Sequence, residues 1–128
     1  MSTLRANALE GVDAKNSITI VAGAGNVTTT NVQEGLNKCW INFDGSGTIA
    51  TRDSFNVSGI TDDSTGRYTV SINNDMSNND YASAGIGNTQ AVTSEAVATT
   101  GITLLSANAS GSQSDVTIMA TSILGDLA

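Results

Sequence analysis

Hydrophobic and polar residues alternate over several short stretches between about Trp40 and Leu127. The clearest stretch is RYTVSI at 67–72, where the aromatic and aliphatic side chains share one face and Arg, Thr and Ser share the other. A period of two residues predicts strands with one solvated face. Full or partial alternation also marks WINF at 40–43, ITLLSA at 102–107 and SDVTIMATSIL at 114–124.

Glycine, asparagine and aspartate separate these runs, most densely in DGSG at 44–47, TDDSTG at 61–66 and NNDMSNND at 73–80. These residues favour turns, so short strands follow one another closely along the chain. This organisation predicts a mainly β chain whose residues 39–128 form an antiparallel β-sandwich or jelly-roll-like domain. YASAGIG at 81–87 is a weaker strand, and residues 88–101 are ambiguous.

The first part of the chain predicts a connector of short strands and one helix. Thr3 to Leu9 and Ser17 to Val21 are β-like runs, and TTTNVQEGLNKCW at 28–40 carries the helix signal. Asn31 can cap the first turn, with a glutamate three residues later, so we expect a helix over about 31–40. Its apolar face would contain Val32, Leu36, Cys39 and Trp40. So short a helix needs a packing partner, and the same helix in sister chains would form an oligomer neck through Val32, Leu36 and Trp40.

Composition favours an oligomer and excludes some partners. Only 4% of the residues are aromatic, so the core must be mostly aliphatic, and contacts between chains would bury further apolar surface. A net charge of −7 with five Lys and Arg residues argues against nucleic acid. No apolar run approaches the length of a membrane span, and the first residues do not resemble a secretion signal.

Candidate chemistry is sparse, because the chain has one cysteine and no histidine. The commonest general base and metal ligand is therefore missing, and we expect no catalytic residue, metal or cofactor. Cys39 is expected to be a buried structural thiol and Trp40 a core anchor. Arg52 beside Asp53 suggests a local ion pair. Asp62 and its neighbours lack the ligand spacing of a calcium loop, and a hairpin turn is the stronger interpretation.

Two polar segments could contact a ligand. Amide side chains beside an aromatic ring suit neutral sugars, because amides donate and accept hydrogen bonds while the ring stacks on apolar sugar faces. Ordinary turns would use the same residues, so both interpretations stay open. The candidate residues are Asn78, Asn79, Tyr81, Asn88 and Gln90.

One pattern between Trp40 and Tyr81 is more specific than these local signals. It contains Trp40, Asn42, Phe43, Gly45, Gly47, Thr48, Arg52, Asp53, Ser54, Asn56, Val57, Ser58, Thr61, Asp62, Gly66, Tyr68, Thr69, Val70 and Tyr81. It resembles a segment that recurs in tail-fibre proteins of tailed bacteriophages, especially those of cyanobacteria and other marine bacteria. The resemblance covers about a third of the chain, and STLRANAL at 2–9 also looks like the start of short phage fibres. The chain lacks the His-x-His pairs of some fibres, and residues from Ala91 onward match no such pattern.

The resemblance implies a homotrimeric virion protein made in the cytoplasm of the bacterial host. Residues 1–38 would attach to the tail or baseplate, and residues 39–128 would form the distal domain that contacts a host-surface glycan. Two alternatives remain open. The chain could be a purely structural baseplate or capsid-decoration component, or a polysaccharide depolymerase, which needs two facing carboxylates.

Overall fold

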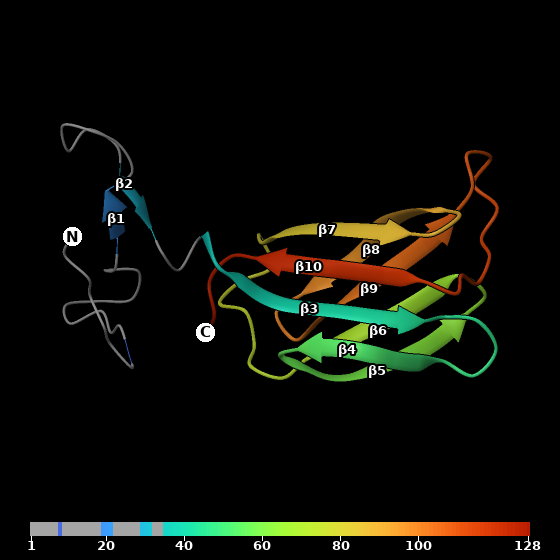
Figure 1. Ribbon diagram of the computed structural model, residues 1–128, viewed down its shortest axis with the longest axis horizontal. Coiled ribbons are helices and arrows are strands. Elements are labelled where there is room, and N and C mark those ends of the chain that lie inside the picture. Colours follow the sequence, from blue (N-terminus) through green and yellow to red (C-terminus); the bar gives the residue numbers. More distant parts are fainter. Residues whose placement is uncertain (1–7, 9–18, 22–28, 32–34) are drawn as a thin grey trace, which may run out of the picture. The chain divides into compact units, whose positions relative to one another are not determined.

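The computed structural model describes Ala8 and residues 19–21, 29–31 and 35–128 (Figure 1). The chain divides into two units, Met1–Leu36 and Asn37–Ala128. In the first unit, β1 (Thr19–Val21) pairs antiparallel with β2 (Thr29–Asn31). Among the described residues, no helix has the length and apolarity needed to cross a bilayer.

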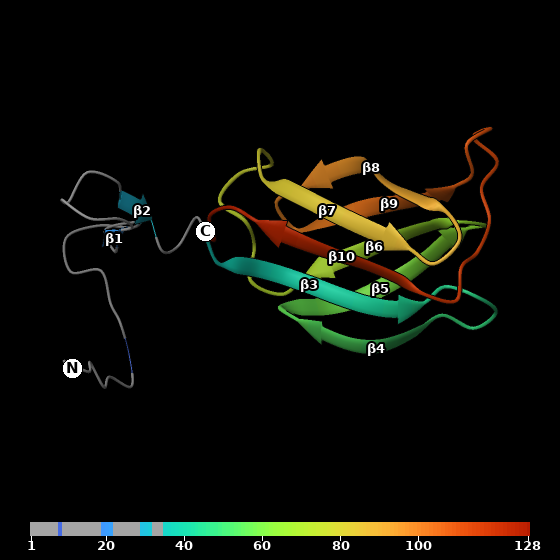
Figure 2. The ribbon, with the colours of Figure 1, turned by 45° about the horizontal axis from the view of Figure 1, so that its top comes forward.

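The second unit is built from two antiparallel four-stranded sheets, which confirms the mainly β prediction. One sheet has the order β4-β3-β10-β7 and the other the order β5-β6-β9-β8 (Figure 2). The strands are β3 (Asn37–Asp44), β4 (Ala50–Phe55), β5 (Val57–Ser64), β6 (Arg67–Ile72), β7 (Ala82–Gly87), β8 (Ala91–Ala98), β9 (Gly101–Ala107) and β10 (Met119–Leu124).

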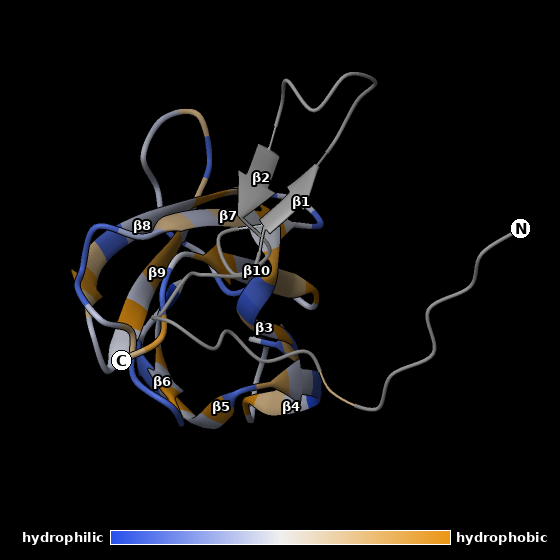
Figure 3. Ribbon diagram, turned by 90° about the vertical axis from the view of Figure 1, so that its left-hand side faces the viewer, coloured by the Kyte–Doolittle hydropathy of each residue, from blue (hydrophilic) through white to orange (hydrophobic). Residues whose placement is uncertain are grey.

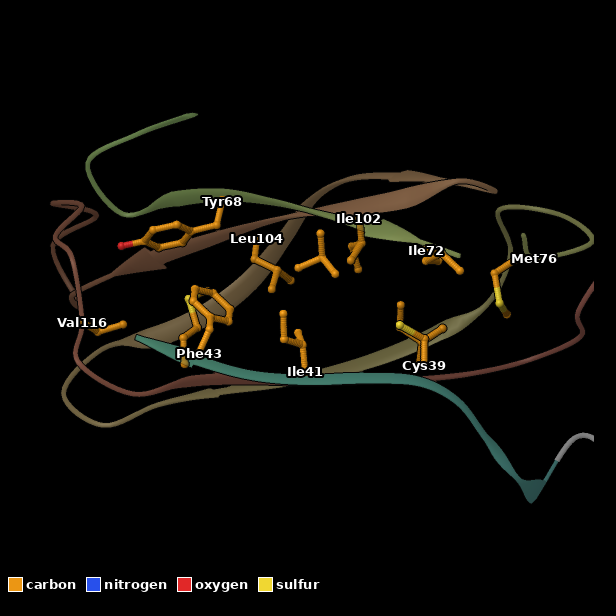
Figure 4. Close-up of a cluster of buried hydrophobic side chains, with 12 residues drawn as sticks. Cys39, Ile41, Phe43, Tyr68, Ile72, Met76, Ile102, Leu104 and Val116 are labelled. Carbon is orange, nitrogen blue, oxygen red and sulfur yellow. The ribbon is translucent and has the colours of Figure 1, made fainter. Parts of the chain in front are cut away.

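The two sheets face each other across one hydrophobic core, in which side chains from β3 oppose those from β6 and β9 (Figure 4). Strand alternation places Phe43 and Tyr68 inward, and their rings meet edge to face at 5.2 Å. The buried apolar residues are Cys39, Ile41, Phe43, Tyr68, Val70, Ile72, Met76, Ile102, Leu104, Val116, Met119 and Ile123. The pattern at 67–72 therefore predicted the buried face of β6 correctly.

Consecutive strands connect the sheets along both sides, with β4 beside β5 and β7 beside β8 (Figure 3). Asn56 turns the chain from β4 into β5 with a positive φ of 57°. Its side chain donates to the carbonyl oxygens of Lys38, at 2.9 Å, and Asn74, at 3.1 Å. On the other side, a Cβ at Gly85 would lie 2.6 Å from a Val92 methyl group, so only glycine fits where β7 passes β8.

The loops of this unit gather at two ends. We call the end where β3 begins the near end; it contains Asn56, residues 73–81, residues 99–100 and the residues after β10. Backbone hydrogen bonds tie it together, including one from Met76 N to the Thr99 oxygen at 2.9 Å. The far end contains the loops at 45–49, 65–66, 88–90 and 108–118.

The expected helix over 31–40 is wrong at both of its ends. Asn31 is the last residue of β2, and Asn37 to Trp40 form the first half of β3, paired with β10. As a strand, this segment places Cys39, Ile41 and Phe43 inside the sandwich by alternation. Gly35 is helical, whereas Val32 and the other residues at 32–34 lie outside the described part of the chain.

Three boundaries also differ from the expectation. Asp62 lies within β5, so the predicted turn shrinks to Thr65 and Gly66. The ambiguous segment contains β8, whose alternation is hidden by a bulge between Ser94 and Ala96. The last strand begins at Met119, because the preceding residues fold into the far-end loop.

Candidate functional site

A shallow groove crosses the outer face of the β4-β3-β10-β7 sheet. It lies over three neighbouring strands, β3, β10 and β7, because β10 pairs with both of the others. Register places Trp40, Ser122 and Ala84 in one row and Asn42, Ala120 and Ile86 in the next. We call the hollow bounded by these six residues the sheet groove.

The size of the side chains explains the hollow. The central strand presents only Ala120 and Ser122, whereas Trp40 stands on one side and Ile86 on the other. Small residues between large ones leave a cavity of about 390 Å³. This volume lies at the lower end of the range of small-molecule sites, which are mostly apolar with a few polar groups.

An ion pair borders the groove on the β4 side. A bulge opposite Asn42 and Phe43 makes Arg52 an extra residue in β4. Its guanidinium group donates to Asp44 at 3.0 Å and to the Phe43 carbonyl oxygen at 3.3 Å, and lies 3.5 Å from Asn42 Oδ1. Arg52 therefore pairs with Asp44, and the pair expected with Asp53 is wrong.

Asp44 also holds the adjacent turn. The Ser46 hydroxyl and amide donate to Asp44 Oδ1 at 2.6 and 2.9 Å, and these bonds lower the pKa of the carboxyl group. This arrangement is the aspartate-stabilised turn expected from DGSG. Asp44 is thus committed to the fold at the rim of the groove.

Trp40 lies on the outer face rather than in the core, so its expected role as a core anchor is wrong. Its partner in register on β4 is Phe55, of which 54% is exposed. Ile86 is 68% exposed on the opposite side of the groove. The outer face of this sheet therefore presents large apolar side chains to its surroundings.

The five residues expected to contact a ligand do not form one site. Asn78, Asn79 and Tyr81 belong to the near end, whereas Asn88 and Gln90 belong to the far end. The six residues of β7 separate the two groups by roughly 20 Å.

Several of these side chains are already engaged in the fold. The Tyr81 hydroxyl lies 3.0 Å from the carbonyl oxygens of Ala98 and Gly101, and burial raises its pKa. Asn88 bonds through its amide to the Thr117 hydroxyl at 3.0 Å and accepts from the Ile118 amide at 3.3 Å.

Two more of them have constrained side-chain oxygens. Asn78 Oδ1 accepts from the Asp80 amide at 2.8 Å. Gln90 Oε1 is buried and has no hydrogen-bond partner within the part of the chain that the structure describes. Only Asn79 is exposed without such a role among the described contacts.

The far-end loops are locked by a hydrogen-bonded cluster. The Tyr68 hydroxyl lies 2.9 Å from both the Gly45 carbonyl oxygen and Asp115 Oδ1, and the Gly66 amide donates to the same Asp115 oxygen at 2.7 Å. Burial and the bond to Asp115 raise the pKa of Tyr68 well above its ordinary value. A Cβ at Gly45 would lie 2.5 Å from the Tyr68 hydroxyl oxygen, so this turn requires glycine.

Cys39 is a buried structural thiol, as predicted. Burial raises its pKa to about 11, which keeps it protonated and unreactive at neutral pH. Among the described residues, no three His, Cys, Asp or Glu side chains come together as a metal site would require.

The sequence contained a signal for the groove that helical periodicity concealed. If WINF is extended back to Asn37 as a strand, Trp40 and Asn42 fall on the face opposite Ile41 and Phe43. The small residues at alternate positions in ASAGIG and in MATSIL then supply the floor. The pairing of β7 with β10, far apart in the sequence, could not be read from either segment alone.

No family model, curated protein or solved structure matches this chain.

Proposed function

We propose that this chain is a bacteriophage tail-fibre protein that recognises a host-surface glycan. The observation that carries the proposal is the sequence pattern between Trp40 and Tyr81, which resembles tail-fibre segments. Its residues include framework positions: Phe43 and Tyr68 contact each other in the core, and Gly45 accepts the Tyr68 hydroxyl. The pattern therefore identifies a structural module and does not by itself say which of its residues bind a ligand.

The assembly belongs to the same proposal. The protein forms a homotrimer in the virion, residues 1–38 attach to the tail or baseplate, and the jelly-roll-like domain points to the host. Leu36, 56% exposed, and Val32 are the proposed contacts between chains. Trp40 is not proposed as a contact between chains, because it lies on β3 rather than on the expected helix.

Binding to cells tests the receptor role directly. The full chain, fluorescently labelled, should bind cells of at least one strain in a panel of cyanobacteria and other marine bacteria, and should reduce adsorption of a phage that infects that strain. Multivalent presentation should strengthen binding, because several weak sites act together. Absence of binding from every strain, together with incorporation into phage particles, would refute the receptor role.

A purely structural virion component is the second candidate, and the apolar outer face of the β4-β3-β10-β7 sheet favours it. Such a face could pack against another virion protein. This candidate predicts assembly onto particles without binding to cells.

Hydrolysis is not part of the proposal. Asp44, Asp63, Glu95 and Asp115 each bond to another side chain or backbone group of the domain. A fibre that only binds its glycan predicts no release of reducing ends when the protein is incubated with surface polysaccharide. Release that depends on one carboxylate would favour a depolymerase.

A further inference from the structure

We propose that the sheet groove is the saccharide-binding site, and that it takes a neutral sugar ring seated against Trp40. This inference rests on the proposed receptor function, but it assigns the binding to a surface different from the loops that the sequence suggested. Those loops lie at two opposite ends of the domain, and the Tyr81 and Asn88 side chains are used to hold them.

The dimensions of the groove fit one ring. The backbones of β3 and β7 lie two strand spacings apart, about 10 Å, with only Ala120 and Ser122 between their side chains. Trp40 stands on the β3 side, in register with Ser122 and Ala84, and Ile86 stands on the β7 side in the next row. A flat ligand can therefore lie along the wall that the indole forms, with the small residues of β10 beneath it.

The polar groups of the groove match a sugar. Within the described part of the chain, neither Asn42 Nδ2 nor the Ser122 hydroxyl has a hydrogen-bond partner, while Asn42 Oδ1 lies 3.5 Å from Arg52. The amide group can donate and the hydroxyl can both donate and accept, as sugar hydroxyls require. The indole contributes the apolar surface on which the C–H face of a ring can stack.

Charge selects a neutral ligand over an acidic one. None of the six residues that define the groove is ionisable, and Arg52 at its border is already paired with Asp44 at 3.0 Å. The net charge of −7 repels acidic polysaccharides.

The same polar groups disfavour an apolar protein surface as the occupant. An apolar surface pressed onto the groove would bury Asn42 Nδ2 and the Ser122 hydroxyl without partners, which is costly. A saccharide satisfies both groups and still covers Trp40 and Ile86.

The test uses Trp40 as its own reporter, because it is the only tryptophan. Acrylamide quenching of the full chain is measured with glucose, galactose, mannose and rhamnose trisaccharides, and with trigalacturonate as the acidic control. Concentrations reach about 50 mM, because one ring in an open groove should bind weakly. At least one neutral probe should lower the quenching constant by about twofold, and trigalacturonate should not.

A matched pair of variants locates the site without removing the reporter. Ala84 and Ala82 are both exposed on the outer face of β7, but only Ala84 lines the groove. Ala84→Leu fills the hollow and should abolish protection by the neutral probe, whereas Ala82→Leu should retain it. Circular dichroism and thermal unfolding verify that both variants are folded. Trp40→Leu, followed by calorimetry with the same probe, gives a second measurement that should also show lost binding.

The outcomes separate this inference from the proposed function. Protection that is lost only in Ala84→Leu supports the groove, even if labelled protein binds no cells. Cell binding that survives in Ala84→Leu overturns the groove and leaves the receptor function standing. Equal protection in both variants, or no protection by any neutral probe, also overturns it. Quenching that depends on protein concentration rather than on saccharide would instead identify a second copy as the occupant.

Discussion

The two sheets turn different surfaces outward. On the β5-β6-β9-β8 sheet, Arg67 bonds to Glu95 at 2.5 Å and approaches Asp63 at 3.5 Å, while the Thr69 hydroxyl bonds to Asp63 and Thr103. On the β4-β3-β10-β7 sheet, the central positions are apolar or carry polar groups with few internal partners. One face satisfies its own hydrogen bonds, and the other leaves apolar area and polar groups available.

This difference indicates where to look for a ligand. Both sheets bury one face by the same alternation of inward and outward residues. Folding the core therefore requires no particular set of side chains on either outer face. A face whose side chains already bond to one another gains little from a ligand. A hollow with an aromatic wall and unused donors gains more, because both area and hydrogen bonds remain to be satisfied.

The largest expected effect on the free energy of unfolding is a difference between the core and the apolar outer face. Phe43 is fully buried and Phe55 is 54% exposed, although both are phenylalanines on neighbouring strands. Phe43→Ala should lower the free energy of unfolding by about 3–5 kcal/mol, because it leaves a cavity. Phe55→Ala should cost at most about 1 kcal/mol. Urea unfolding measures both, and equal costs would show that the outer face belongs to the folding core.

A smaller effect on stability is expected from the two sides of β3, on which the adjacent residues Cys39 and Trp40 face inward and outward. Cys39 points inward, and burial raises its pKa to about 11 from an ordinary value of 9.0. The unfolded chain therefore loses this proton at lower pH than the folded chain, so the stabilisation is complete below pH 9 and is lost as pH rises through 11. The loss should be roughly 2–3 kcal/mol.

Denaturation midpoints measured from pH 8 to 11 check this window. A Cys39→Ala control should lack this part of the decline but keep the contribution of Tyr68, whose pKa is also raised by burial. Iodoacetamide at pH 8 should label native Cys39 at least about a hundredfold more slowly than an unfolded peptide, because labelling requires opening. Acrylamide should nevertheless reach Trp40, and a shielded Trp40 in the free protein would contradict its assignment to the outer face.

The stability cost of removing one hydroxyl group from a central strand allows the two outer faces to be compared. The Thr103 hydroxyl lies 2.9 Å from the Thr69 hydroxyl, and Thr103 is almost fully buried. Thr103→Val should cost about 1 kcal/mol, because it removes one hydrogen bond. Ser122→Ala on β10 should cost less than about 0.5 kcal/mol, because its hydroxyl has no partner within the described residues. A larger cost for Ser122→Ala would mean that the groove hydroxyl is already used in folding.

Alternation and turn residues were enough to predict the fold class. RYTVSI gave the buried face of β6, because no bulge interrupts its pairing with β9. Bulges limited the prediction elsewhere: the shift between Ser94 and Ala96 puts Val92 and Val97, five residues apart, on the same inward face. Periodicity cannot reveal β8 when the period itself changes within the strand.

The candidate site was harder to predict, since its residues come together only through pairing. Trp40 and Asn42 lie across β10 from Ala84 and Ile86, which are more than forty residues later in the sequence. The apolar spacing from Val32 to Trp40 also matched a short helix. In the structure, Asn37 to Trp40 instead belong to β3, and Cys39 is buried between the sheets. Amide-rich loops were visible in the sequence, whereas their division between two ends was not.

The smallest expected effect concerns the ion pairs of the polar face. Arg67 and Glu95 are both well exposed, and the hydrogen bond that Arg67 donates to Glu95 raises the pKa of Arg67. Glu95→Gln should nevertheless reduce stability less than Thr103→Val, because water screens exposed pairs and Asp63 remains beside Arg67. The difference from the native protein should shrink further in 1 M salt, where such pairs are screened over about 3 Å. Urea midpoints at low and high salt measure it. A cost above that of Thr103→Val would mean that charge, rather than the threonine hydroxyls, holds the polar face together.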